Sequence, residues 1–320
     1  MQKRNNRQTF YVFADRWLQN TKLHVKESSY VKYVNLLQNH ILPELGPIRM
    51  CNMTTEVVEA FIKNRLTMGK MSGNGGLSEK TVKDMLMVVK EIHYFAACQN
   101  VQMPCQFELI KMRPSSAEVT VLKVREQRAL EELLLRDDSL TSTGVLLSLY
   151  MGLRLGEVCA LTRKHIIYSQ RLLQVRGTMQ RIQNIGEDGA KKTKVIVTEP
   201  KSVSSVRDIP IPHFLFQRLE CLRELPEDVF LLTGSNKKFI EPRSMENIFR
   251  RMLKECEIEH TNYHTLRHTF ATRCIENGFD VKTLSEILGH ANVNITLNRY
   301  VHSSMDQKRH NMEKVGRILR

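Results

Sequence analysis

The stretch HTLRHTFAT, residues 264–272, places an imidazole and a guanidinium three residues apart at the expected start of a helix. Residues at positions i and i+3 share one helical face, so His264 and Arg267 could reach one common anion, such as a phosphate. His268, the next residue, falls on a different face and is expected to be structural. For a lone pair of this kind, an ordinary core or surface histidine is the commoner explanation.

The bulk composition favours two basic domains. A chain of 320 residues exceeds what one compact core usually holds. Lys and Arg number 48 against 34 Asp and Glu, and the excess occurs in both parts of the chain, with 14 against 8 in the first 100 residues. Two basic bodies could hold a polyanionic duplex from opposite sides, although an inert basic surface would explain the charge as well.

The cysteines and the apolar segments point to a reducing compartment. The seven cysteines form no Cys-x-x-Cys pair and are odd in number, which argues against a zinc or disulfide framework. The most apolar run, GVLLSLYMGL, ends at Arg154, and no apolar segment follows the charged first ten residues. We therefore expect no signal peptide, no membrane span and a cytoplasmic location.

The chain up to residue 100 has helical patterns, which predict a first domain over residues 8–100. The apolar positions of FYVFADRWL fall on one helical stripe. Pro43 and Gly46-Pro47 are expected to close a second helix, and Thr54 and Ser78 are candidate N-caps of two further helices. These elements predict a small all-helical domain.

Residues 101–120 lack periodicity and predict a linker to a second domain over residues 121–320. That domain opens with two helical patterns, EQRALEELLL and TGVLLSLYMGL. Four β-rich pieces then predict a small antiparallel sheet: IIYSQRLLQVRG, RIQNIG, KVIVTEP and VRDIPIP. Helical patterns resume after Pro212, so the predicted class is mainly α with a small β insertion.

Two more segments carry charged side chains suited to phosphate chemistry. Arg154 follows an apolar helix and a glycine, and Glu157 lies three residues later, where it could orient the guanidinium. Lys201 lies near a predicted turn between two strands, from which a lysine could protonate a leaving alkoxide. Taken singly, a surface ion pair and a solvated lysine are the commoner explanations.

A fourth segment adds a histidine and a candidate nucleophile. The sequence Leu288-Gly-His places His290 just past a helix that ends in glycine, and the interval to Tyr300 has room for one short helix. A phenol has a pKa near 10, so its attack on phosphorus requires nearby cations and a proton acceptor. On its own, Tyr300 would more often be a packing residue.

In this order the four segments resemble the tyrosine recombinase family, also called phage integrases, over nearly the whole chain. The resemblance implies a SAM-like core-binding domain over residues 8–100 and an α-helical catalytic domain with a small antiparallel sheet over residues 121–320. The interval from His290 to Tyr300 is similar to that in integrases of Gram-positive conjugative transposons. The implied catalytic residues are Arg154, Glu157, Lys201, His264, Arg267, His290 and Tyr300.

The resemblance also implies the chemistry. Tyr300 would attack a DNA phosphodiester to give a 3′-phosphotyrosyl link and a free 5′-hydroxyl, without ATP, metal or cofactor. His264 would accept a proton and Lys201 would supply one. The non-bridging oxygens would be held by Arg154, Arg267 and His290.

The implied partners are double-stranded DNA and further copies of the chain. Exchange between two duplexes needs four active sites, so we expect a homotetramer on DNA, a monomer free in solution, and a bacterial, nucleoid-associated location. The amphipathic segment 303–320 could pack on a neighbouring protomer or on its own domain. Two rivals remain: an architectural DNA-binding protein that has lost catalysis, and a type IB topoisomerase.

Overall fold

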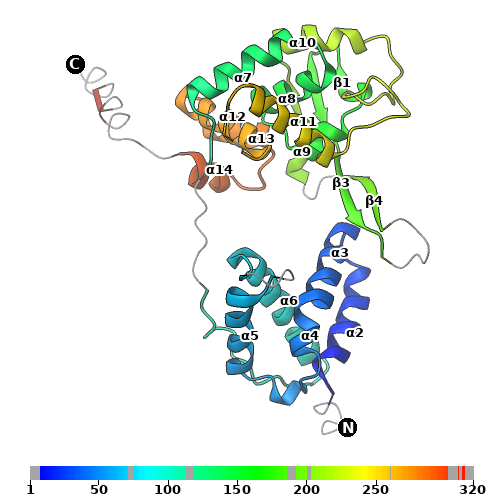
Figure 1. Ribbon diagram of the computed structural model, residues 1–320, viewed down its shortest axis with the longest axis vertical. Helices are drawn as coiled ribbons and strands as arrows, with labels where there is room; N and C mark the ends of the chain where they lie inside the picture. Colours follow the sequence, from blue (N-terminus) through cyan, green and yellow to red (C-terminus); the bar gives the residue numbers. More distant parts are fainter. Residues whose placement is uncertain are drawn as a thin grey trace. The chain divides into compact units, whose positions relative to one another are not determined.

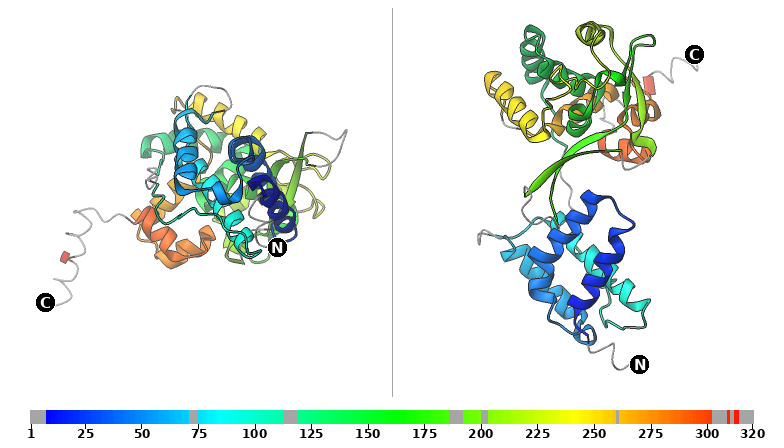
Figure 2. Two further views of the ribbon diagram at one scale, coloured as in Figure 1. Left: turned by 90° about the horizontal axis from the view of Figure 1, so that it is seen from below. Right: turned by 90° about the vertical axis from the view of Figure 1, so that its right-hand side faces the viewer.

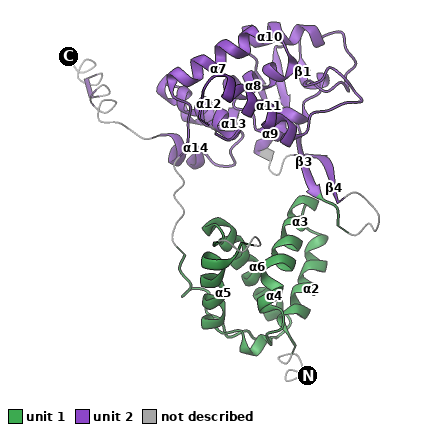
Figure 3. Ribbon diagram, in the orientation of Figure 1, with its two compact units in different colours: residues 1–117, 183–190 green, residues 118–182, 191–320 purple. Residues whose placement is uncertain are grey.

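The chain forms two compact units, coloured separately in Figure 3. One contains residues 1–117 and 183–190, and the other contains residues 118–182 and 191–320. Each unit has a hydrophobic core of its own, and the class is mainly α with small sheets, as the sequence predicts. The computed structural model describes residues 8–70, 75–112, 119–185, 192–199, 203–259, 261–301, 309 and 312–313.

The first unit is a helical bundle, seen from two further sides in Figure 2. Thr54 and Ser78 accept hydrogen bonds from the backbone N–H groups of Val57 and Thr81, so both predicted N-caps are confirmed. The elements are α2 (Phe10–Lys22), α3 (Glu27–Leu36), the π-helical turn η1 (Leu37–Ile41), α4 (Leu42–Leu45), the 3₁₀ turn η2 (Met50–Asn52), α5 (Thr55–Met68) and α6 (Glu79–Ala97).

Of the two signals predicted to close the second helix, Gly46-Pro47 is confirmed and Pro43 is wrong. The chain continues from α3 through the π-helical turn η1 into α4, and Pro43 lies in the first turn of α4. The π-helical turn η1 lies just before this proline, so the regular α-helical hydrogen-bond pattern already changes where Pro43 lacks an N–H group. The helical path ends at Gly46, which is the C-cap of α4.

The linker was expected to cover residues 101–120, but the first residues of this segment belong to the core of the first unit. Val101, Met103, Cys105 and Phe107 are buried in the core of the first unit, together with side chains of its helices. Apolar surface removed from water contributes roughly 25 cal/mol per Å². This segment therefore belongs to the fold of the first unit, and its buried residues alternate along residues 101–107, a short period that the sequence analysis missed.

The second unit is built around α8 (Leu140–Met151), as Figure 1 shows. Its helices are α7 (Val124–Arg136), α8, α9 (Leu155–Ala160), α10 (His213–Leu219), α11 (Pro242–Glu255), α12 (His264–Glu276), α13 (Val281–Leu288) and α14 (Val293–Tyr300), with the 3₁₀ turns η3 (Arg163–His165), η4 (Val203–Ser205) and η5 (Glu220–Leu222). Its strands are β1 (Ile166–Ile167), β2 (Leu172–Val175), β3 (Thr178–Gln183), β4 (Thr193–Thr198) and β5 (Arg207–Pro210).

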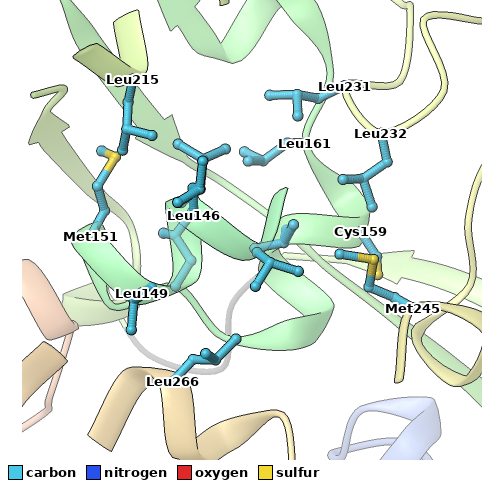
Figure 4. Packing of buried hydrophobic residues seen from close by; sticks show 14 of the residues in the cluster. Leu146, Leu149, Met151, Cys159, Leu161, Leu215, Leu231, Leu232, Met245 and Leu266 are labelled. Carbon is cyan, nitrogen blue, oxygen red and sulfur yellow. The ribbon is translucent and has the colours of Figure 1, made fainter. Parts of the chain in front are cut away.

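Helix α8 explains the most apolar run of the sequence. Nine of its twelve residues are buried, so it is covered on nearly all sides, and it packs against α7, α9, α10, α11 and α12. Figure 4 shows Leu146 and Leu149 of α8 among apolar side chains from several of these helices, including Leu215 and Leu266. Among the described residues, no helix combines the length and apolar character that crossing a bilayer requires.

The strands form two small sheets where the sequence predicted one. Strand β2 lies between β1 and β5 in an antiparallel sheet, while β3 and β4 pair with each other. In this register Leu173 lies opposite Ile209, and Val175 lies opposite Arg207. Side chains alternate along a strand, so Arg207 points to the same buried side as Ile209. The sheet thus carries a guanidinium into the interior of the second unit.

Candidate active site

The site begins where the chain leaves α8. Arg154 is the N-cap of α9, and its backbone N–H donates to Oε2 of Glu157 at 2.9 Å. The guanidinium Nη1 donates to Oε1 of the same carboxylate at 2.7 Å, so the expected orientation of Arg154 by Glu157 is present. The Arg154 side chain is 35% exposed, while that of Glu157 is only 4% exposed. Arg154 is therefore fixed from within and accessible to a ligand from outside.

A second arginine, which the sequence reasoning missed, holds the same carboxylate. Arg207 donates from Nη1 and Nη2 to the two oxygens of Glu157, at 3.1 and 2.9 Å, and from Nε to the carbonyl of Ile287 at 2.5 Å. Burial alone would raise the pKa of Glu157, but the hydrogen bond and charge of Arg207 and the charge of Arg154 hold it at about 2. Glu157 is therefore ionised at neutral pH.

Arg267 lies deeper than the other predicted residues. It is 1% exposed, and its two terminal nitrogens donate to the carbonyls of Gly152 at 2.7 Å and Leu288 at 2.6 Å. Burial, together with the nearby charge of Arg154, lowers the pKa of Arg267 to about 9, so it remains a cation at neutral pH. The guanidinium thus ties the end of α8 to the end of α13.

His264 lies closer to the solvent than Arg267 does. It is the first residue of α12, as predicted, but its side chain is exposed. The part of the ring that packs against the protein is removed from water, and this desolvation, followed by the charges of Arg267 and Arg154, lowers the pKa of His264. Because solvent reaches the ring, it also screens this shift. His264 is thus an accessible imidazole that is neutral at neutral pH.

His290 follows a left-handed glycine. Gly289 caps α13 with a φ of +65°, as predicted, and turns the chain so that Nδ1 of His290 lies 2.8 Å from Oγ1 of Thr296 on α14. Burial, followed by the charges of Arg267 and Arg154, lowers the pKa of His290 to about 3. The ring is therefore neutral and has a fixed orientation.

Tyr300 is the last residue of α14, the short helix that the spacing predicted. It is 6% exposed, and its ring lies parallel to that of His290, with 6.5 Å between the ring centroids. Burial raises the pKa of Tyr300, although the charges of Arg267 and Arg299 oppose this effect. The side chain is thus a protonated phenol within a group of cations.

The expectation that His268 lies on a different face of α12 from His264 is wrong. Its Nδ1 lies 2.7 Å from the hydroxyl oxygen of Tyr300, and its ring centroid is 4.4 Å from that of His264. The sequence did contain a signal: His264 and His268 are four residues apart, so they share one face of α12. A histidine therefore contacts the candidate nucleophile directly.

The structure brings six of the seven predicted residues together, from the region where α8 leads into α9 and from helices α12, α13 and α14. These three helices contact one another in the second unit (Figure 1). Lys201, between β4 and β5, lies outside the described residues. With His268 added, the guanidiniums of Arg154 and Arg267, three neutral imidazoles and a phenol are groups that can hold and attack a phosphate diester.

Comparison with known proteins identifies the family. The profile described as "Phage integrase family" matches residues 125–307, which is more than half of the chain. The chain belongs to the phage integrase family. A second profile, "Phage integrase, N-terminal SAM-like domain", matches residues 9–66. The resemblance inferred from the four segments is therefore confirmed.

This phage integrase family member has relatives among recombinases and transposases. It is 26% identical over 316 residues to a "Tyrosine recombinase XerC-like" protein of Caldanaerobacter subterraneus subsp. tengcongensis, covering 92% of this chain and 79% of that protein. It is 30% identical over 211 residues to transposase A of transposon Tn554 from Staphylococcus aureus, covering 63% of this chain. The match spans 54% of that transposase, about half its length.

Solved structures show the same fold. The integrase of transposon Tn1549, in complex with transposon right end DNA, matches with a TM-score of 0.76 and 22% identity, covering 96% of this chain and 99% of that one. A λ integrase tetramer bound to a Holliday junction matches with a TM-score of 0.65 and 14% identity. At these identities the likeness establishes the fold of this phage integrase family member.

Proposed function

We propose that this chain is a site-specific DNA recombinase that cleaves and rejoins double-stranded DNA through a 3′-phosphotyrosyl link to Tyr300. The observation that carries the proposal is the position of Tyr300, whose hydroxyl lies among Arg154, Arg267 and His290 in a chain of the phage integrase family. A purely DNA-binding protein has no use for a buried phenol within such a group.

The guanidinium groups supply the positive charge that the reaction needs. As Tyr300 attacks, charge builds up on the non-bridging oxygens of the phosphate, where Arg154, Arg267 and His290 would donate hydrogen bonds. Arg267 already donates two hydrogen bonds to backbone carbonyls, so its position does not depend on the ligand. The site is pre-organised, which lowers the cost of reorganisation at the moment of reaction.

Cleavage releases a 5′-hydroxyl, whose oxygen needs a proton. Lys201 is the proposed donor, on the evidence of the sequence pattern alone. The covalent phosphotyrosyl bond keeps the energy of the broken phosphodiester, so rejoining requires no nucleotide. No cofactor or metal ion enters these steps.

The proposed assembly is a homotetramer on DNA that forms from monomers. Related structures are described as bound to DNA, including a tetramer on a Holliday junction, and two cleavages on each of two duplexes need four tyrosines. Residues 8–100 would serve as the core-binding domain and residues 121–320 as the catalytic domain. The proposed location is the bacterial cytoplasm, in association with the nucleoid.

A plasmid assay tests this function against both rivals. Candidate sites come from inverted half-sites in the sequence that flanks the gene, and two copies are cloned into a supercoiled plasmid. A recombinase yields products with new junctions between the two sites, whereas a topoisomerase yields only relaxed circles and an architectural protein yields neither. Absence of new junctions with every flanking sequence, under conditions where the protein binds those sites, would reject the proposal.

A further inference from the structure

The hydroxyl of Tyr300 has a specific partner in the free protein. Nδ1 of His268 lies 2.7 Å from this oxygen, with the two ring planes inclined at 52°. His290 is parallel to the tyrosine ring, but its own Nδ1 is engaged with Thr296. Among the histidines that the structure describes near Tyr300, His268 is therefore the one whose ring nitrogen is placed to exchange a proton with the phenol.

We propose that His268 accepts the phenolic proton of Tyr300 when the tyrosine attacks the scissile phosphate. The inference rests on the proposed function and gives to His268 the task that the family resemblance gives to His264. It makes His268 a catalytic residue, since its ring touches a reacting atom.

The proposed step balances. The bond between the Tyr300 oxygen and phosphorus forms, the proton of that oxygen moves to Nδ1 of His268, and the bond between phosphorus and the 5′-oxygen breaks. The 5′-oxygen takes its proton from the acid, for which Lys201 is proposed. In the rejoining step a 5′-hydroxyl attacks phosphorus and gives its proton back to Lys201, and the bond between phosphorus and the Tyr300 oxygen breaks. The imidazolium of His268 returns its proton to the departing phenolate, which restores the starting state.

The surroundings of His268 keep it in the state that such a role needs. The groups that face it are His264 and Arg267 on α12 and Arg299 and Tyr300 on α14. Burial first, then His264, Arg299 and Arg267, lower the pKa of His268 to about 4, so its ring is neutral and has an unprotonated nitrogen at neutral pH. The anionic phosphate would offset the nearby cations and make the ring more basic as the substrate binds.

His264 and His268 of α12 then have different roles in the proposed reaction. They lie one helical turn apart, with their ring centroids 4.4 Å from each other and the rings nearly perpendicular. His264 is exposed and can reach an incoming phosphate, whereas His268 is half-buried and contacts the nucleophile. The motif His264-x-x-Arg267-His268 thus supplies three separate contacts to one reaction centre.

The first test examines the hydrogen bond in the full-length free protein by ¹⁵N NMR of the histidine rings. If His268 is an acceptor, Nε2 carries the ring proton, Nδ1 is unprotonated, and the Nδ1 resonance shifts when Tyr300 is replaced in Tyr300→Phe. A ring protonated on Nδ1, or one that is unaffected by Tyr300→Phe, would overturn the inference without any DNA.

The second test measures the rate of covalent adduct formation on a nicked duplex that carries the recombination site. In His268→Asn, the amide oxygen can replace Nδ1 as a hydrogen-bond acceptor but cannot take up a proton. We expect unchanged DNA affinity and a rate reduced by about 10²–10⁴-fold at pH 7, with the deficit shrinking as the pH rises and phenolate forms without help. His213→Asn, at an exposed histidine of the same unit, is the control.

The outcomes separate the two proposals. An adduct that needs Tyr300 but forms at the wild-type rate in His268→Asn, or a deficit that stays constant with pH, would reject the role of His268 and leave the proposed function intact. Failure of the wild-type protein to form an adduct would reject the proposed function, and the inference with it. Comparison with His268→Gln and circular dichroism of each variant exclude misfolding as the cause of a loss.

Discussion

Arg207 and Glu157 form a two-point ion pair inside the second unit, with Nη1–Oε1 and Nη2–Oε2 distances of 3.1 and 2.9 Å. Both side chains are at most 6% exposed. The pair joins β5 to α9, and the third bond of Arg207, to the carbonyl of Ile287, joins both to the end of α13. One guanidinium therefore fixes the carboxylate that orients Arg154 and the helix that leads to His290.

Replacement of Arg207 is expected to destabilise the second unit. Arg207→Ala removes one partner of a buried ion pair and should cost about 3–5 kcal/mol in the free energy of unfolding. The measurement is urea unfolding followed by circular dichroism. The single tryptophan, Trp17, lies in the core of the first unit, so its fluorescence transition should stay unchanged.

An exposed ion pair provides the control for Arg207. Arg243 pairs with Glu246 on one face of α11, and its side chain is 70% exposed. Arg243→Ala should cost at most about 1 kcal/mol. Equal losses for Arg207→Ala and Arg243→Ala would contradict the structural role assigned to Arg207.

The ionisation of Glu157 should appear in the pH dependence of stability. Its pKa is about 2 in the folded protein, below the ordinary value of 4.5, so its contribution is complete above about pH 4.5 and is lost as the pH falls toward 2. The difference in unfolding free energy between wild type and Glu157→Gln should therefore be constant from pH 7 to 5 and shrink below pH 4.5. A difference that does not change down to pH 3 would show that Glu157 titrates normally.

Gly289 should tolerate alanine less well than another left-handed glycine does. A Cβ at Gly289 would lie 3.0 Å from the carbonyl of Ser204 and 3.1 Å from Cδ of Arg207, whereas a Cβ at Gly278 would meet nothing within 4 Å. Both residues have positive φ, so each substitution carries a backbone cost of about 1–2 kcal/mol. Gly289→Ala should lose more stability than Gly278→Ala, and it should also slow DNA cleavage because His290 moves. Equal effects would argue against the close packing of Gly289.

A substrate with a different leaving group tests whether Lys201 is the proton donor, because the nucleophile Tyr300 is unaffected by that change. In a substrate whose 5′-bridging oxygen is replaced by sulfur, the leaving group departs as a thiolate and needs no proton donor. The Lys201→Ala variant should cleave normal DNA about 10²–10⁴-fold more slowly than wild type. It should cleave the sulfur substrate at nearly the wild-type rate. Lys192→Ala, at an exposed residue just before β4, should behave as wild type on both substrates. A Lys201→Ala defect that persists on the sulfur substrate would exclude the role as acid.

The sequence was a good guide where local rules determine structure. Thr54 and Ser78 cap the helices that they were predicted to cap, because an N-cap depends on a side chain and a backbone group three residues away. Gly289 ends its helix in the left-handed conformation for a similar local reason. Gly46 ends the second helical path as predicted, whereas Pro43 was misjudged because the π-helical turn before it was not foreseen.

The structure brings together the predicted site residues that it describes, but only some of the contacts among them could be predicted from the sequence. Arg154 and Glu157 are three residues apart, so their contact followed from helical spacing. The partner of Glu157 from β5, Arg207, is 50 residues away in sequence, and its burial depends on a strand register that the sequence does not specify. The contact between His268 and Tyr300 also joins helices whose packing no local pattern determines.

The most direct test of the central claim is to identify the amino acid that carries the DNA. The full-length protein is trapped on a nicked duplex, digested with nuclease and protease, and analysed by mass spectrometry for a nucleotide-modified peptide. The account predicts one modified peptide, containing Tyr300 with a 3′-phosphate ester, and no adduct in Tyr300→Phe. A DNA-linked peptide that lacks Tyr300, or an adduct that persists in Tyr300→Phe, would contradict it.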